Sequence, residues 1–152
     1  MTQSASGVAT GALGAVSPAA AGSEAFGTLA RLRRDAAVVG SIISVLDWDQ
    51  ETQQPAGGTA IRSDQLGYLS GVKHAKSTSS AMGDAIAACE ADADLMADGW
   101  ASANVRQARR DFDKATKLPG ELVEEIARSR STGMVAWRAA REASDFSMFA
   151  GA

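Results

Sequence analysis

The residues that could do chemistry gather in the segment VLDWDQETQQPAGG, residues 45–58. An apolar run ends in Asp47, Asp49 and Glu51, and the segment then breaks at Pro55. Acidic side chains are disfavoured at the C-terminus of a helix, where the macrodipole is already negative. Three explanations are open: a metal site, a set of catalytic carboxylates, or a structural network that is neutralised by a cation from elsewhere in the chain.

Two specific kinds of site are excluded by the spacing of these residues. An EF-hand loop beginning at Asp47 would need glycine at its sixth position and glutamate at its twelfth. Those positions hold Thr52 and Gly58. Glycosidases of the chitinase type place alternating carboxylates along a strand, with every second side chain on one side. Here the acidic residues continue a helical stripe, and Ser44 stands where that signature has its first aspartate.

The rest of the chain provides no partners for a catalytic or metal centre. On a helix, Asp47 and Glu51 share a face and Asp49 points away from them. The chain has one histidine, His74, and one cysteine, Cys89, so neither His-Glu-x-x-His nor a paired-cysteine spacing for zinc occurs. A Gly-x-Ser-x-Gly nucleophile motif is missing too. The sequence therefore predicts no catalytic residue, no metal ligand and no cofactor in this chain.

A structural network remains as the interpretation of the acidic segment. Arg62 follows the turn at Pro55 and can reach back to Asp49 or Glu51. A carboxylate paired with arginine gains charge-assisted hydrogen bonds, and Gln65 can satisfy what remains. With Trp48 packed nearby, we expect a network of Trp48, Asp49, Glu51, Arg62 and Gln65 that fixes how the second helix leaves the first.

The elements that must position these residues are helices. Leu29, Leu32, Ala36, Val39, Ile43 and Leu46 recur at alternating spacings of three and four, which puts them on one stripe of a helix. The same periodicity predicts helices over residues 24–52, from 59 toward 74, from about 80, over 101–115, from 120 and from about 145. The inner stripe of the fifth is expected to be Leu122, Ile126, Ser129, Gly133, Ala136 and Ala140. We predict an all-α fold, an antiparallel array of five to six helices.

Composition limits the class of protein further. Residues 1–22 carry no charge and are rich in Ala, Gly and Ser, so we expect a disordered tail there and a helical region over 23–152. Without Lys or Arg, this tail does not read as a signal peptide. The net charge of −3 argues against nucleic-acid binding. No apolar run approaches the roughly 20 residues of a membrane span, and a single cysteine requires no oxidising compartment. We expect a cytoplasmic protein.

Three segments resemble one known family. The segment VLDWDQETQQPAGGTAIRSDQLGYLSGVKH (45–74) resembles the N-terminal region of the carboxypeptidase Taq family of zinc metallopeptidases, with its Trp-Asp-x-Glu-Thr and Pro-x-Gly-Gly motifs and the following Arg and Gln. RQARRDFDKATKLPGELV (106–123) and WRAAREASDFSMF (137–149) resemble later segments of the same family, in the same order. The resemblance covers most of residues 29–149, and the tail lies outside it.

The resemblance implies the N-terminal part of a larger all-helical peptidase. Members of this family are zinc enzymes, often dimeric, that remove C-terminal amino acids from peptides with broad specificity. Their zinc ligands lie in a His-Glu-x-x-His helix that has no counterpart here, so the chain is expected to be inactive alone. Exposed apolar surface is expected to give self-association or a homodimer. The alternative, from another class, is a self-contained helical interaction module without catalysis.

Overall fold

The computed structural model describes residues 16–151 as a helical protein. Five of its helices are longer than ten residues, and no strand occurs in the described part of the chain, which confirms the all-α prediction. The elements are α1 (Pro18–Gly22), α2 (Glu24–Thr52), η1 (Ala56–Gly58), α3 (Thr59–Ser77), α4 (Ser80–Ala91), α5 (Ala93–Ala97), α6 (Gly99–Ala115), α7 (Gly120–Ala143) and η2 (Phe146–Met148), where η marks a 3-10 turn.

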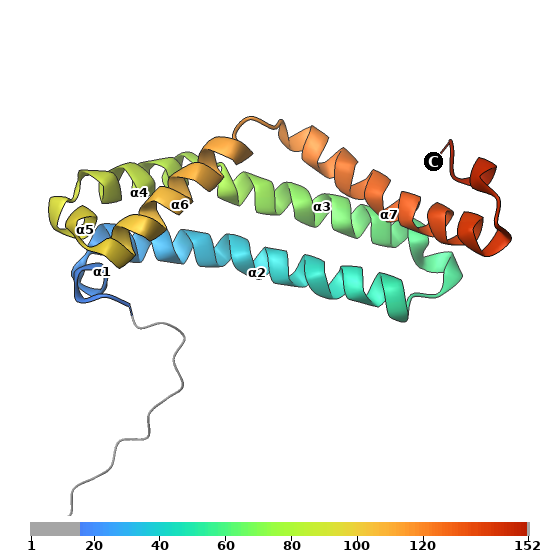
Figure 1. Cartoon of the computed structure of the whole chain (residues 1–152), viewed down its shortest axis with the longest axis horizontal. Coiled ribbons are helices and arrows are strands. Elements are labelled where there is room, and N and C mark those ends of the chain that lie inside the picture. Colours follow the sequence, from blue (N-terminus) through green and yellow to red (C-terminus); the bar gives the residue numbers. More distant parts are fainter. Residues whose placement is uncertain (1–15, 152) are drawn as a thin grey trace, which may run out of the picture.

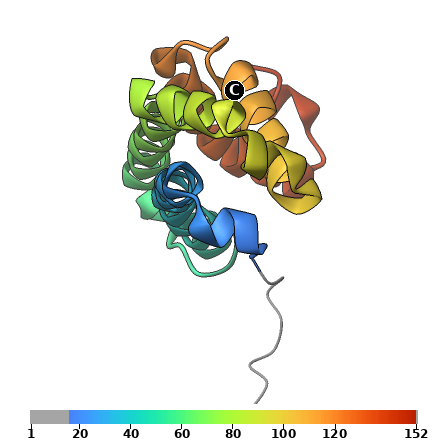
Figure 2. The ribbon, with the colours of Figure 1, turned by 90° about the vertical axis from the view of Figure 1, so that its left-hand side faces the viewer.

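Helices α2 and α3 form a long antiparallel hairpin, and α7 lies alongside α3 (Figure 1). The Ser23 hydroxyl caps the start of α2 by accepting a hydrogen bond from the Phe26 amide at 3.3 Å. The helix ends at Thr52, close before Pro55, because proline disfavours helical backbone in the residue before it. Helices α1, α4, α5 and α6 cluster at the other end of the hairpin, which Figure 2 shows end-on.

The predicted tail is helical in its last residues. Ser17 caps α1, with Pro18 in the first turn, where a missing N–H has no cost. Ala20 is only 3% exposed and joins the core beside Leu29, which explains why this short helix forms at all. The expectation of disorder is therefore wrong for Pro18–Gly22, and residues 1–15 lie outside the described part of the chain.

The main core lies at the clustered end of the molecule. Ile86, Cys89 and Val105 are completely buried there, and Leu95 is 1% exposed. Leu95 belongs to α5, a short helix that the sequence periodicity did not predict, because five residues are too few to show a period. Arg109 holds α6 to α4 through a forked contact with the Glu90 carboxylate at 2.7 and 3.0 Å. This arginine also lowers the pKa of Glu90 below its usual range.

Helix α7 is rotated away from the orientation that its own apolar stripe predicts. Of the expected inner stripe, Ala140 is buried, but Leu122 is 40% and Ile126 is 53% exposed. The face that meets α3 instead carries Glu124 and Arg128, and Ser131, which is 1% exposed, contacts Gln50 of α2. The prediction was wrong because Gly67 and Gly71 of α3 leave space for the long side chains of Arg128 and Glu124 of α7. The partner helix therefore decides which face of α7 is covered.

The end of α7 also differs from the prediction. Ser144 adopts a left-handed backbone with φ 53°, a conformation that terminates helices. In place of a sixth helix from Asp145, the structure has the three-residue turn η2, whose Ser147 amide donates to the Asp145 carboxylate at 2.9 Å. Phe146 in this turn is 75% exposed.

The contact between α3 and α7 depends on glycine. A Cβ built on Gly67 would lie 2.7 Å from Cγ and Nε of Arg128, and one on Gly71 would collide with Glu124. We therefore expect Gly67→Leu to lower the free energy of unfolding by about 1–3 kcal/mol through overpacking. The matched control is Gly27→Leu, because a Cβ at Gly27 meets nothing within 4 Å and leucine favours a helix over glycine. Equal stability of the two variants in urea unfolding would contradict the close α3–α7 contact.

Candidate functional site

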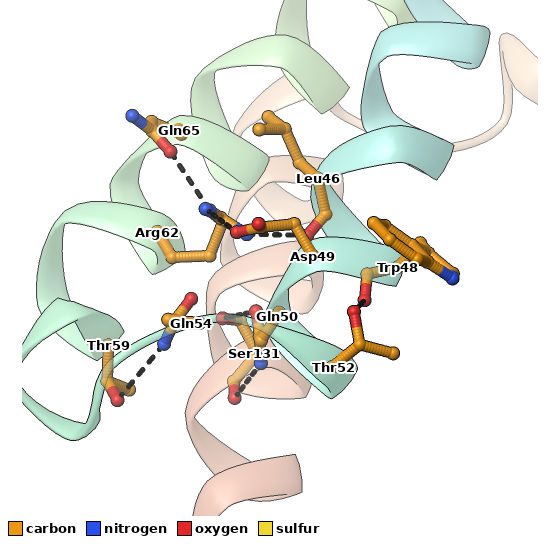
Figure 3. A network of polar contacts seen from close by, with 10 residues as sticks. All are labelled: Leu46, Trp48, Asp49, Gln50, Thr52, Gln54, Thr59, Arg62, Gln65 and Ser131. Carbon is orange, nitrogen blue, oxygen red and sulfur yellow. Dashed lines mark hydrogen bonds and ion pairs between the residues drawn. The ribbon is translucent and has the colours of Figure 1, made fainter.

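Arg62 is the centre of the polar network at the α2–α3 turn (Figure 3). It lies in the first turn of α3, and its guanidinium binds three acceptors. One Nη donates to the Asp49 carboxylate at 2.5 Å, and the other donates to the Leu46 carbonyl at 2.6 Å. Nε donates to the Gln65 side-chain oxygen at 3.0 Å. The arginine side chain is 13% exposed, so these contacts are partly shielded from water.

The network compensates the negative charge of Asp49 at the C-terminal end of α2. Asp49 brings a negative charge to the last turn of α2, where the helix macrodipole is already negative. Arg62 neutralises this carboxylate and at the same time donates a hydrogen bond to the Leu46 carbonyl, about one turn earlier in α2. Its fork therefore ties the end of α2 to the start of α3 and sets the angle between them.

The structure brings together three of the five residues that the sequence proposed. Asp49, Arg62 and Gln65 meet, whereas Trp48 and Glu51 lie outside the network. Successive residues turn by about 100° around a helix, so the neighbours of Asp49 point elsewhere. Trp48 is 62% exposed, and its one contact drawn in Figure 3 is made by its backbone carbonyl, which accepts a hydrogen bond from the Thr52 hydroxyl at 2.8 Å. Glu51 lines a small cavity of about 60 Å³ together with Asp47.

Sequence reasoning missed a second, more deeply buried polar contact. The Gln50 amide nitrogen donates to the Ser131 carbonyl at 3.0 Å, and the Ser131 hydroxyl donates to the Gln50 oxygen at 2.8 Å. Gln50 is 7% exposed, and this reciprocal pair joins α2 to α7. A signal for it exists in the sequence, because Gln50 continues the stripe of α2 four residues after Leu46. A glutamine at a core position of a helix needs a polar partner.

The part of the chain that the structure describes contains no cluster of side chains suited to binding a metal ion. Between residues 16 and 151, no group of three or more His, Cys, Asp or Glu side chains lies together. The Cδ2 of His74 lies 3.6 Å from a Cβ built on Gly120, which places the imidazole in the packing between α3 and the start of α7. Burial raises the pKa of Cys89, so this thiol is a poor nucleophile. The contacts at the α2–α3 turn can position helices, but the described residues do not fit a metal site.

Comparison with known proteins identifies the class to which this scaffold belongs. Residues 28–152 match the family model described as carboxypeptidase Taq (M32) metallopeptidase. Thermostable carboxypeptidase 1 of Thermus thermophilus is 28% identical over 128 residues, which cover 82% of this chain and 25% of that protein. A crystal structure described as BsuCP superimposes with a TM-score of 0.73 at 25% identity, over 82% of this chain and 25% of the other.

The chain belongs to the carboxypeptidase Taq (M32) metallopeptidase family. The resemblance inferred from the three segments is thereby confirmed, and it disfavours a self-contained module of unrelated origin. The chain spans about a quarter of the length of the relatives it matches. None of the helices in the described part of the chain is long and apolar enough to cross a membrane.

Proposed function

We propose that this chain is the non-catalytic, N-terminal helical scaffold of a zinc-dependent metallocarboxypeptidase. The observation that carries the proposal is the family match over residues 28–152, in a chain that spans only a quarter of its relatives. In such enzymes a bound metal polarises the scissile carbonyl and activates water. The proposal is supported by the described residues, which hold no group of three or more His, Cys, Asp or Glu side chains that could bind a metal ion. The part proposed for them is to hold helices at fixed angles.

The substrate of the whole enzyme is proposed to be the C-terminal end of peptides, with broad side-chain specificity. Support comes from the family description and from the name of the Thermus relative, both of which specify a carboxypeptidase. We also propose a cytoplasmic setting, because the single cysteine, Cys89, is a free and buried thiol that needs no oxidising environment.

The proposal predicts that the purified chain binds no stoichiometric zinc and has no carboxypeptidase activity. The assay would follow amino-acid release from an N-blocked dipeptide with and without added zinc, with the Thermus relative as positive control. Elemental analysis would measure bound zinc in the same preparation. One tightly bound zinc per chain together with chelator-sensitive hydrolysis would overturn the proposal. In that case His74→Ala would show whether the one histidine is a ligand.

A further inference from the structure

A pocket of about 420 Å³ lies where α2, α3, α4 and α6 face one another. Its volume is within the range of roughly 300–1,000 Å³ that is typical of small-molecule sites in proteins. Most of its lining residues are apolar, and several are alanines, whose short side chains leave the space between the helices unfilled. The apolar lining residues are Ala36, Ala37, Met82, Ala108, Phe112 and Ala115. These walls favour a hydrocarbon chain, because a chain that enters the pocket removes apolar surface from water.

Two of the charged residues in the lining neutralise each other. Arg33 donates a hydrogen bond to the Asp111 carboxylate at 3.4 Å, and both residues line the pocket. The Asp111 carboxylate also accepts a hydrogen bond from the Gln107 side-chain amide at 2.7 Å. Asp111 is the only carboxylate among the residues that line this pocket, and both of its oxygens are engaged. A positively charged ligand would therefore find no free acceptor there.

Lys73 is the third charged residue of the lining, and its charge is not compensated. Its ammonium forms no ion pair and no hydrogen bond with any residue in the part of the chain that the structure describes. A Cβ built on Gly40 would lie 3.4 Å from Nζ of Lys73, so the ammonium lies against α2, about one turn after Ala36 and Ala37. The pocket thus combines apolar walls with one free positive charge.

This combination favours one class of ligand. A carboxylate beside Lys73 would form a charge-assisted hydrogen bond with the ammonium. A neutral ligand of the same shape would leave that ammonium without a partner. A free amino acid would bring its own ammonium close to Lys73, and Asp111 is already occupied by Arg33 and Gln107. The lining therefore suits a ligand that has a carboxylate at one end and no second charge.

We propose that this pocket binds a small monocarboxylate with an unbranched apolar chain. The carboxylate pairs with Lys73, and the chain lies against Phe112 and the alanines of α2 and α6. The pocket shares no lining residue with the Arg62 network, and the proposal does not depend on the peptidase assignment.

Calorimetric titration of the whole chain with octanoate tests the ligand class, at concentrations below those at which octanoate forms micelles. Octanol and octylamine have the same chain with no charge and with the opposite charge, and each should bind at least about tenfold more weakly. Free leucine has a carboxylate and an ammonium, and it should also bind at least about tenfold more weakly. Equal affinity for octanoate and octanol would overturn the role of the carboxylate, and equal affinity for leucine would overturn the choice of a ligand without an ammonium.

Two variants test the position of the ligand. Lys73→Met should weaken octanoate binding by about tenfold and leave octanol binding unchanged, whereas Lys73→Arg should retain most of the affinity. Lys114→Met is the matched control, because Lys114 is exposed on α6 and does not line the pocket. Ala37→Leu should weaken the binding of both ligands, because the larger side chain fills the pocket. Ala37 is exposed, so this change leaves the core intact.

Methionine methyl groups report directly where octanoate binds. Met82 lines the proposed pocket, and Met134 lines the apolar groove on the exposed side of α7. In a chain with carbon-13 in its methionine methyl groups, octanoate should shift the resonance of Met82 and not that of Met134. A shift of Met134 alone, or an affinity that neither Lys73→Met nor Ala37→Leu changes, would overturn the proposal and place the ligand on α7. The absence of saturable octanoate binding would overturn it as well.

Discussion

Replacing Ile86 by alanine should lower the free energy of unfolding by about 2–5 kcal/mol, because it leaves a cavity in a rigid part of the core. Ile86 is completely buried and belongs to the cluster that includes Cys89 and Val105. Natural domains have only about 5–15 kcal/mol of stability in total, so this one change could remove a large part of it.

Urea unfolding followed by circular dichroism measures this effect. The matched control is Ile61→Ala, because Ile61 has the same side chain and is 60% exposed on α3. We expect the control to change the stability by less than about 0.5 kcal/mol. Similar losses in the two variants would mean that the end formed by α1, α4, α5 and α6 is not the part of the molecule that holds the fold together.

Arg62→Ala should cost about 2–3 kcal/mol, because it removes three hydrogen bonds and leaves the Asp49 charge without its partner. The loss should not reach the upper end of the range known for buried pairs, since the Asp49 side chain is 35% exposed and water can reach it. Arg62→Lys keeps the positive charge but not the planar fork, and should recover only part of the loss.

Arg33→Ala is the comparison that shows how much the burial of the Arg62–Asp49 ion pair contributes to stability. Arg33 also forms an ion pair, with Asp111 at 3.4 Å, but the two side chains are 39% and 52% exposed. Exposed pairs contribute about 0–1 kcal/mol, so this variant should be nearly as stable as the wild type. If Arg62→Ala were no more harmful than Arg33→Ala, the network at the α2–α3 turn would be only a surface contact. A double-mutant cycle with Asp49→Ala would then give no coupling.

Several properties of this protein followed from the sequence by itself. The stripe of α2, its cap at Ser23 and its end before Pro55 were predictable, because a 29-residue helix shows many periods and its ends depend on local residues. Arg62 could be placed near Asp49 for a similar reason: a short turn leaves few positions for a side chain one turn into the next helix. The family was also evident, because three separated segments of the sequence resemble motifs of that family and occur in the same order as in the family.

The tertiary structure decided what depends on neighbouring helices. The periodicity of α7 gave an apolar stripe, but Gly67 and Gly71 of α3 cover another face, and the stripe remains exposed. Trp48 looked like a packing residue, yet the rotation of α2 that brings Asp49 to Arg62 turns its ring toward solvent. Gln50 finds Ser131 only because α2 and α7, far apart in the chain, are brought together by α3. Local spacing defines the faces of a helix, and the shape of the partner helix chooses which of them is buried.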